Sequence, residues 1–365
     1  MTSGLLPQGF HDRLPPHADA AAALEARVLA TAHAHGYERV DPPLAEFEDS
    51  LASRLKSGSA HDAVRFVDPV SQRTLAIRTD MTAQIGRIAA TRMGHHPRPV
   101  RLSYAGPVVK LRAPQLHPER AMRQIGVELI GSDGVAAAKE IVAVAVEALQ
   151  AAGVDGLSID FTLPDLVDTL ADGRLSRERL SALRQRLDAK DAAGVAAIDP
   201  AYLPLVAAAG PFDEALAGLR AYGSAALASR LDGMARIADR VRGSVAMTLD
   251  PTELHGFEYQ SWFGFSLFAA GSRDAVGRGG SYTIVHGDGR EEAAVGFSLY
   301  ADAVLVGRAG GEGRKRLFLP LGTDPDHAAA LRRDGWVTVA ALDDADTPQA
   351  QLCTHRLAPE GPVAA

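Results

Sequence analysis

The chain has 365 residues, of which 47% are hydrophobic and 23% are charged, and it is long enough for about two or three globular domains. Its formal net charge of -7 argues against a dominant nucleic-acid-binding surface, because such surfaces draw most of their affinity from neutralised phosphates. The one cysteine, Cys353, excludes a disulfide framework and a cysteine-based metal site.

The first half of the chain mixes helices and strands without regular alternation. After an extended arm at residues 1–16, a helix is predicted at 17–35, with Leu24, Val28 and Ala32 on its inner face. Two further helices are predicted, at 82–93 and 134–152. Strands are predicted at 37–41, 64–70, 74–77, 98–104, 108–111, 122–130 and 157–162, and the second and third form a hairpin. This order predicts an α+β fold in which a mostly antiparallel sheet is flanked by helices.

The second half begins with a change in composition. From residue 164 to about 242 the hydrophobic periodicity is helical throughout, which predicts a helical insertion. Two strands follow, at 245–249 and 261–269. A glycine-rich turn is predicted at 277–282, and a buried strand that passes into a helix at 294–305. A small α/β segment begins near residue 314, and the last residues are expected to be disordered.

Neither end of the chain suggests a membrane. The N-terminal sequence has no apolar segment of signal-peptide length, and no run approaches the ~20 apolar residues that cross a bilayer. We therefore expect no membrane association and a cytoplasmic location.

The stretch RQIGVELIG, residues 123–131, has two faces if it forms a strand. Gln124, Gly126 and Glu128 lie on one face, and the other face is wholly apolar and is expected to pack on a helix. The polar face must be solvated, paired or occupied by a ligand, because burial of a lone carboxylate is costly. Gly126 leaves room for a ligand or another backbone to approach. From these residues alone, a solvated face is the simpler interpretation.

Two other segments also have two interpretations. At a strand–helix junction, Thr79 or Asp80 would cap the helix, or Asp80 and Thr82 would instead hold an ammonium group. The three glycines of GRGGSY, residues 277–282, would either let a ligand approach beside Tyr282 or form a plain turn. The residues alone leave both alternatives open.

Five segments, collinear over residues 5–310, resemble histidyl-tRNA synthetase, a class II aminoacyl-tRNA synthetase. They are YERVDPPLAEFED (motif 1, the dimer-forming strand), LAIRTDMTAQIGRIA (amino-acid-binding segment), GPVVKLRAPQLHPERAMRQIGVELIG (motif 2), GRGGSY (glycine-rich tyrosine strand) and AAVGFSLY (motif 3). The resemblance implies a class II synthetase-like fold. It divides the chain into a first part of the core, an insertion, a second part of the core and a small truncated C-terminal segment, at 1–163, 164–243, 244–310 and 311–365.

The resemblance implies that the amino-acid pocket is retained. The residues at the positions that contact the ammonium and imidazole groups of histidine in that family are Asp80, Thr82, Gln124, Glu128, Tyr259 and Tyr282. A carboxylate that faces an imidazole nitrogen rejects analogues that lack the matching hydrogen-bonding group. Two positions depart from the family, since Asp80 replaces a glutamate and Gln260 replaces a second tyrosine.

The positions of the family's ATP site are altered. Lys110 replaces an arginine that binds phosphate, and a lysine is a point charge where arginine offers a planar fork. Arg112 replaces a glutamate, and His255 and Ala303 replace arginines. Because clamping phosphoryl groups is a large electrostatic contribution to catalysis, we infer that adenylate chemistry is absent. We expect no catalytic residue, no cofactor and no metal ion.

Together these features resemble the regulatory subunits of ATP phosphoribosyltransferase, the first enzyme of histidine biosynthesis. Only about fifty residues follow Gly310, where a synthetase carries an anticodon-binding domain of about a hundred. The resemblance implies a regulatory subunit without aminoacylation activity that forms a homodimer, does not bind tRNA and assembles with a short-form catalytic subunit. It also implies histidine as the allosteric effector of feedback regulation.

Two alternatives stay open at this point. The first is a divergent histidyl-tRNA synthetase or a free-standing histidine-activating ligase, against which the altered ATP-site positions argue. The second is a histidine sensor with another partner. A cationic loop, formed by Lys110, Arg112, Arg120 and Arg123, would contact an anionic ligand, a partner or solvent.

Overall fold

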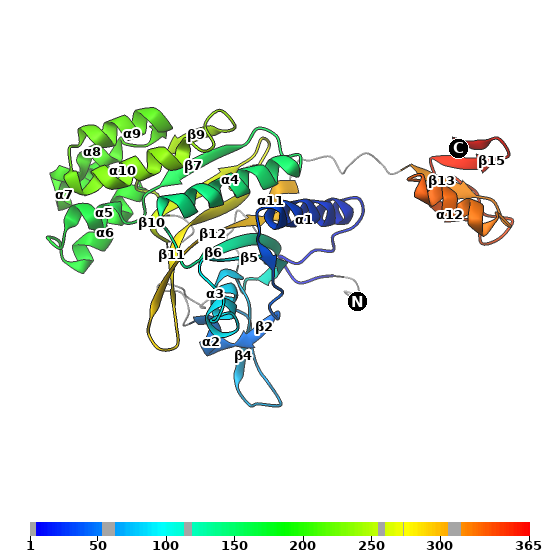
Figure 1. Ribbon diagram of the computed structural model, residues 1–365, viewed down its shortest axis with the longest axis horizontal. Coiled ribbons are helices and arrows are strands. Elements are labelled where there is room, and N and C mark those ends of the chain that lie inside the picture. The colour runs from blue at the N-terminus through cyan, green and yellow to red at the C-terminus, as the bar shows by residue number, and fades with distance from the viewer. Residues whose placement is uncertain (1–4, 53–62, 113–118, 255–259, 273, 306–314) are drawn as a thin grey trace. The chain divides into compact units, whose positions relative to one another are not determined.

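The computed structural model describes residues 5–52, 63–112, 119–254, 260–272, 274–305 and 315–365. The chain divides into two compact units (Figure 1). The larger unit contains Met1–Arg13 and Ala21–Arg308, and the smaller contains Leu14–Ala20 and Ala309–Ala365. The four-part division of the sequence stays a prediction.

In the described part of the larger unit, nine strands form one sheet. Their order across the sheet is β1 (Glu38–Arg39), β5 (Val100–Val109), β6 (Ala121–Ile130), β12 (Glu291–Tyr300), β11 (Gly277–Val285), β10 (Gln260–Phe268), β7 (Ser158–Thr162), β9 (Ala246–Leu249) and β8 (Gly210–Pro211). The pairs β1–β5 and β7–β9 are parallel, and all other neighbours are antiparallel. The prediction of a mostly antiparallel sheet is confirmed.

Strand β5 corrects one detail of the sequence prediction. It continues through Pro107, where two separate strands were expected. A proline has no N–H to donate, so within sheets it is confined to edges and bulges. The neighbouring strand β1 pairs only with Leu102 and Ser103, so at Pro107 β5 is an edge strand on that side. The absent N–H of Pro107 therefore interrupts no hydrogen bonding between β5 and β1.

The glycines of GRGGSY predicted a turn, but the segment forms the first part of strand β11. A Cβ atom at Gly279 would lie 2.5 Å from the ring of Phe265 and 2.6 Å from the carbonyl oxygen of Gly296. The glycines therefore permit close packing of the sheet rather than a reversal of the chain.

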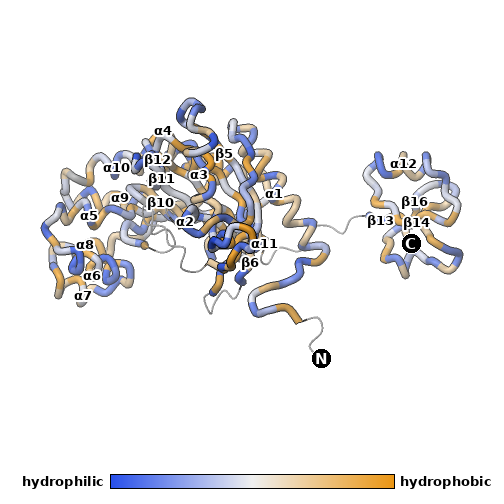
Figure 2. The backbone as a smooth tube through the Cα atoms, turned by 90° about the horizontal axis from the view of Figure 1, so that it is seen from below, coloured by the Kyte–Doolittle hydropathy of each residue, from blue (hydrophilic) through white to orange (hydrophobic). Residues whose placement is uncertain are grey.

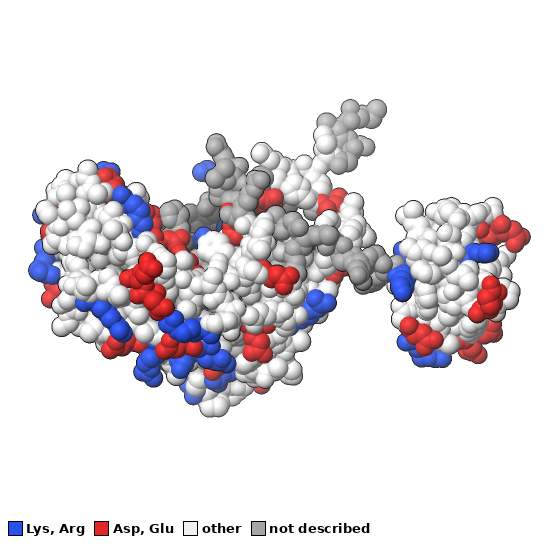
Figure 3. All heavy atoms as spheres, turned by 90° about the horizontal axis from the view of Figure 1, so that it is seen from above, with Lys and Arg blue, Asp and Glu red and all other residues white. Residues whose placement is uncertain are grey.

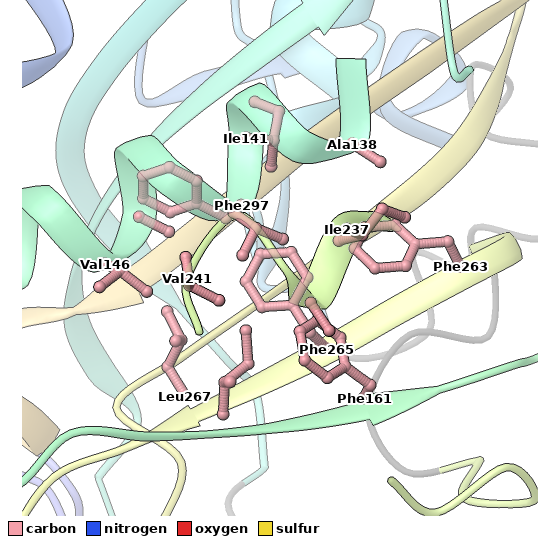
Figure 4. Close-up of a cluster of buried hydrophobic side chains, with 14 of the residues drawn as sticks. Ala138, Ile141, Val146, Phe161, Ile237, Val241, Phe263, Phe265, Leu267 and Phe297 are labelled. Carbon is pink, nitrogen blue, oxygen red and sulfur yellow. The ribbon is translucent and has the colours of Figure 1, made fainter. Parts of the chain in front are cut away.

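One face of the sheet packs against two helices, α1 (His17–Ala34) and α4 (Val135–Ala151). Figure 4 shows Ile141 and Val146 of α4 facing the side chains of β10 and β12 in the hydrophobic core. Ile125, Val127 and Leu129 belong to the same core, so the apolar face of RQIGVELIG packs as predicted. The predicted inner face of α1 (Leu24, Val28 and Ala32) is buried as well.

The other face carries α3 (Thr82–Thr91), whose Ile85 and Ala89 are buried against β5, β6 and β11. Beside it lies a small antiparallel sheet of three strands in the described residues, namely β2 (Ala45–Phe47), β4 (Thr74–Ile77) and β3 (Arg65–Val67). The pairing of β3 with β4 confirms the predicted hairpin.

The insertion is helical, as predicted, apart from the two residues of β8. Its helices are α5 (Leu166–Ala171), α6 (Arg177–Asp188), α7 (Ala192–Ile198), the 3-10 turn η1 (Pro200–Tyr202), α8 (Leu203–Val206), α9 (Phe212–Ala221) and α10 (Ala225–Ala238). Hydrophobic and hydrophilic residues alternate along these helices (Figure 2), as expected where each helix buries one side. None of the helices in the described residues is long and apolar enough to cross a membrane.

The smaller unit corrects the prediction of a disordered end. Strands β13 (Arg316–Leu319) and β14 (Val337–Ala340) are joined by α12 (Pro325–Arg333), as the sequence predicted. The last residues then add β15 (His355–Ala358) and β16 (Gly361–Ala364) to the same sheet. The end of the chain is ordered because β15 pairs with β13 and β16 returns beside β15.

Phe161 joins the sheet to the insertion, and this contact yields a stability prediction. Its ring is fully buried and lies 5.5 Å from the ring of Phe212 in α9, between centroids. We expect Phe161→Ala to lower the free energy of unfolding by about 3–5 kcal/mol, through lost burial and a residual cavity. Chemical denaturation measures the change. The control Val70→Ala removes methyl groups that are 90% exposed and should change stability by less than about 0.5 kcal/mol. Equal effects of the two substitutions would contradict the assigned core.

Candidate functional site

The polar face of β6 is buried and internally paired. Gln124 is 0% exposed and Glu128 is 1% exposed, so the solvated-face interpretation is wrong for these side chains. Both lie between the sheet and the beginning of α3, where strands β5, β11 and β12 contribute further polar groups. We call this group of residues (Asp80, Thr82, Tyr104, Gln124, Glu128, Tyr282 and Ser298) the polar cluster.

Glu128 accepts hydrogen bonds from two tyrosines. The hydroxyl of Tyr104 donates to its Oε1 atom at 3.0 Å, and the hydroxyl of Tyr282 donates to its Oε2 atom at 2.7 Å. Burial raises the pKa of Glu128 to about 8, although the two tyrosine hydrogen bonds act in the opposite direction. At neutral pH the carboxyl group is therefore largely protonated.

Two glycines make room for this carboxyl group. Gly296 of β12 is the cross-strand partner of Glu128, and a Cβ atom there would overlap the Glu128 carboxylate. At Gly126, a Cβ atom would lie 2.5 Å from the hydroxyl oxygen of Tyr104. The opening predicted at Gly126 exists, and a tyrosine hydroxyl approaches through it.

Gln124 links the sheet to the start of α3. Its Nε2 atom donates to Oδ2 of Asp80 and to Oγ of Ser298, both at 2.7 Å. Its Oε1 atom accepts from the backbone N–H of Met81 at 2.9 Å. The amide group is thus engaged on both sides, which fixes its orientation.

Asp80 combines a local role with a place in the cluster. Its Oδ1 atom accepts from the backbone N–H of Thr82 at 2.7 Å, so it satisfies one of the free donors at the helix start. Its other oxygen faces Gln124. The helix-capping interpretation is thereby supported, and ammonium binding stays a prediction. The hydroxyl of Thr82 lies 3.4 Å from that of Tyr104.

Sequence reasoning missed two members of the cluster. The hydroxyls of Tyr104 and Ser298 lie 3.0 Å apart and connect Gln124 to Glu128. The alternation of faces along a strand could have placed each of them, since Tyr104 lies on the same face as Leu102 and Ser298 lies on the same face as Gly296. The sequence did not tell which strands are neighbours.

Three of the four altered ATP-site positions lie within the described residues. His255 and Tyr259 lie outside the described residues. Lys110 is half-buried just after β5, Arg112 is exposed, and Ala303 packs partly against the main core from α11 (Ala301–Leu305).

Two arginines of the predicted cationic loop are engaged within the protein. Arg123 forms an ion pair with Glu25 of α1. Arg120 donates from Nε to the carbonyl oxygen of Lys110 at 3.1 Å. No group of three or more potential metal ligands occurs in the part of the chain that the structure describes.

A large antiparallel sheet with helices on both faces and a buried polar cluster at the α3 junction defines a class II aminoacyl-tRNA synthetase-like protein. The family model described as histidyl-tRNA synthetase matches residues 9–304. A crystal structure titled as an ATP phosphoribosyltransferase regulatory subunit/histidyl-tRNA synthetase from Bacillus halodurans shares the fold. Its TM-score is 0.79, at 20% identity, and the match covers 96% of each chain.

Curated relatives narrow this class. The chain is 44% identical to the ATP phosphoribosyltransferase regulatory subunit of Paramagnetospirillum magneticum, over 98% of this chain and 97% of that protein. It is also 44% identical to the regulatory subunit of Rhodospirillum centenum, over 93% of this chain and 89% of that protein. The chain belongs to the family of ATP phosphoribosyltransferase regulatory subunits.

The buried carboxyl group predicts an unusual pH dependence of stability. Folding raises the pKa of Glu128 from an ordinary 4.5 to about 8, so between these values the folded protein binds more protons than the unfolded chain. The stability contribution of Glu128 therefore falls as pH rises through this window. We therefore compare the free energies of unfolding of Glu128→Gln and of the unsubstituted protein. We expect their difference to shift in favour of Glu128→Gln by on the order of a few kcal/mol as the pH rises from about 5 to about 8.

Urea unfolding at both pH values measures this difference. The control is Glu360→Gln, which neutralises an exposed carboxylate of the smaller unit and should leave the pH dependence unchanged. If the free energy of unfolding of Glu128→Gln changed with pH as much as that of the unsubstituted protein, the raised pKa of Glu128 would be contradicted.

Proposed function

We propose that this chain acts in the cytoplasm as a regulatory subunit without aminoacylation activity, and that it assembles with a short-form ATP phosphoribosyltransferase catalytic subunit. The observation that carries the proposal is the 44% identity to named regulatory subunits over nearly the full length of both chains. In this role the chain supports the first step of histidine biosynthesis and its feedback regulation by histidine.

The residues of the ATP-site segments support the absence of adenylate chemistry. Forming an adenylate requires fixed cations that face the phosphates as charge develops. Here Ala303 supplies no cation, and Arg123 of the motif 2 strand is committed to Glu25. The synthetase-like fold is common to both candidate functions and does not favour an active ligase.

The polar cluster supports histidine as the effector. Gln124, Ser298 and Tyr104 form a chain of hydrogen bonds with a carboxyl group at each end, Asp80 and Glu128. An ammonium group suits the carboxylate of Asp80, and an imidazole, which carries one donor and one acceptor nitrogen when neutral, suits Glu128 with its tyrosines. Histidine would regulate by binding the states of the assembly unequally.

The proposal includes a homodimer and excludes tRNA as a partner. Strand β1, in the motif 1 segment, lies at the edge of the sheet, and both of its residues are exposed. Edge strands are natural sites of pairing between chains. On the face shown in Figure 3, Lys and Arg side chains are interspersed with Asp and Glu, so this face offers no continuous basic surface for a nucleic acid.

Reconstitution tests the regulatory role. We expect a purified short-form catalytic subunit to form phosphoribosyl-ATP at least about tenfold faster with this chain than alone, because the complete assembly is the active form. Initial rates with and without the chain measure the effect, and an unrelated protein at equal concentration is the control. Equal rates would reject the role. Histidine-dependent exchange of pyrophosphate into ATP by the chain alone would instead favour the ligase.

Calorimetry tests the histidine site. We expect Glu128→Gln to weaken histidine binding by about tenfold or more, in the chain alone or with the catalytic subunit, because an amide NH2 group cannot accept the hydrogen bonds that the replaced carboxyl oxygen accepts. Glu360→Gln should leave the affinity unchanged. If histidine binds Glu128→Gln as tightly as the unsubstituted chain, the effector site lies elsewhere.

A further inference from the structure

The helical insertion contains a polar cleft that shares no residue with the polar cluster. Its volume is about 790 Å³, and its lining comes from the end of α5, the segment before α6, the turn η1 and the α9–α10 connection. This volume lies in the range of pockets that bind small molecules. These helices lie beside β9, near one end of the large sheet (Figure 1).

One buried side chain in the cleft has an unused hydrogen-bonding group. Tyr202 is 5% exposed and lines the cleft, and its hydroxyl has no hydrogen-bond partner among the described residues. By contrast, the hydroxyl of Tyr222 donates to the carbonyl oxygen of Ala201 at 2.9 Å. The hydroxyl oxygen of Tyr202 is not among the fully buried polar atoms, so it opens on the cleft, where it can donate a hydrogen bond to a ligand.

Opposite charges lie beside this hydroxyl. Burial raises the pKa of Tyr202, the positive charge of Arg174 lowers it, and the negative charge of Asp199 raises it. The same two charges act in the same directions on the pKa of Tyr222. Arg174 and Asp199 line the cleft together with the two tyrosines, and the phenol of Tyr202 stays a neutral donor.

The protein fixes both charged groups without neutralising them. Arg174 donates from Nε and Nη2 to the carbonyl oxygens of Ala171 and Leu170 at the end of α5, which holds its guanidinium in place. Asp199 accepts at Oδ1 from the backbone N–H of Ala201 at 2.9 Å. Within the described ranges, neither Arg174 nor Asp199 forms an ion pair, so each retains hydrogen-bonding capacity for a ligand.

The charge balance of the lining selects the class of ligand. The cleft is lined by three carboxylates and two guanidinium groups, namely Asp168, Asp172, Asp199, Arg174 and Arg179. Asp168 is paired with Arg184, so the remaining charges of the lining balance, and a nucleotide or sugar phosphate would gain no net positive charge there. A zwitterion gains from both signs, since a carboxylate suits Arg174 and the Tyr202 hydroxyl while an ammonium suits Asp199.

We propose that this cleft binds a free α-amino acid, whose carboxylate is held by Arg174 and Tyr202 and whose ammonium is held by Asp199. The volume leaves room for the amino-acid side chain and for bridging water. This site is independent of the proposed function and of the polar cluster, because it uses only residues of the insertion.

The test uses the full chain carrying Glu128→Gln, which weakens the proposed histidine site, and it omits histidine, so that the polar cluster does not contribute. Each other standard amino acid is titrated separately by calorimetry at up to millimolar concentration. We expect at least one to bind, and expect its N-acetyl and methyl-ester derivatives to bind at least about tenfold more weakly, since each lacks one charge. Failure of every amino acid to bind would overturn the proposal, as would preferential binding of inorganic phosphate or ribose 5-phosphate.

Substitutions within the cleft locate the binding. Tyr202→Phe removes only the unpaired hydroxyl and should weaken binding about fivefold or more without lowering thermal stability. Asp199→Asn keeps an acceptor for the Ala201 N–H but removes the charge, and should weaken binding further. The control Asp232→Asn removes a surface carboxylate paired with Arg220 on α9, and should leave binding unchanged. Binding that is unaffected by both cleft substitutions would contradict the assignment.

Discussion

The burial of the Glu128 carboxyl group without a cationic partner constrains the centre of this protein. Among the described residues, its hydrogen-bond partners are two tyrosine hydroxyls, and burial raises its pKa because the charged form loses its hydration. The neighbouring strands are built around this group. Glycine is required at Gly296, where any side chain would overlap the carboxylate, and at Gly126, where it would meet Tyr104.

The polar cluster also determines how the helix α3 meets the sheet. Gln124 accepts from the N–H of Met81 and donates to Asp80, so the residues before the helix are attached to the middle of strand β6. Such buried polar networks are costly when incomplete and rigid when satisfied. The satisfied hydrogen bonds therefore hold the start of α3 in a fixed position on the sheet.

The same scaffold serves enzymes and regulatory subunits because the fold and the chemistry are separable. In this chain the sheet and its flanking helices have the histidyl-tRNA synthetase-like fold. The positive charges near motif 2 have a different use, since Arg123 is paired with Glu25 and Arg120 contacts the backbone of Lys110. The cleft of the insertion differs from the polar cluster, because its lining, which includes the Tyr202 hydroxyl, opens on a volume of about 790 Å³.

The sequence by itself determined the local structure, because hydrophobic periodicity and helix-breaking residues act over a few positions. It predicted the helices α1, α3 and α4, the β3–β4 hairpin, the two faces of RQIGVELIG and the helical insertion. Only the tertiary structure decided which distant residues meet. Tyr104 and Ser298 join the polar cluster across 194 positions, and Gly279 pairs with both β10 and β12, where the ring of Phe265 leaves no room for a side chain. The ordered chain end and the insertion cleft depend in the same way on contacts between segments, which no local pattern records.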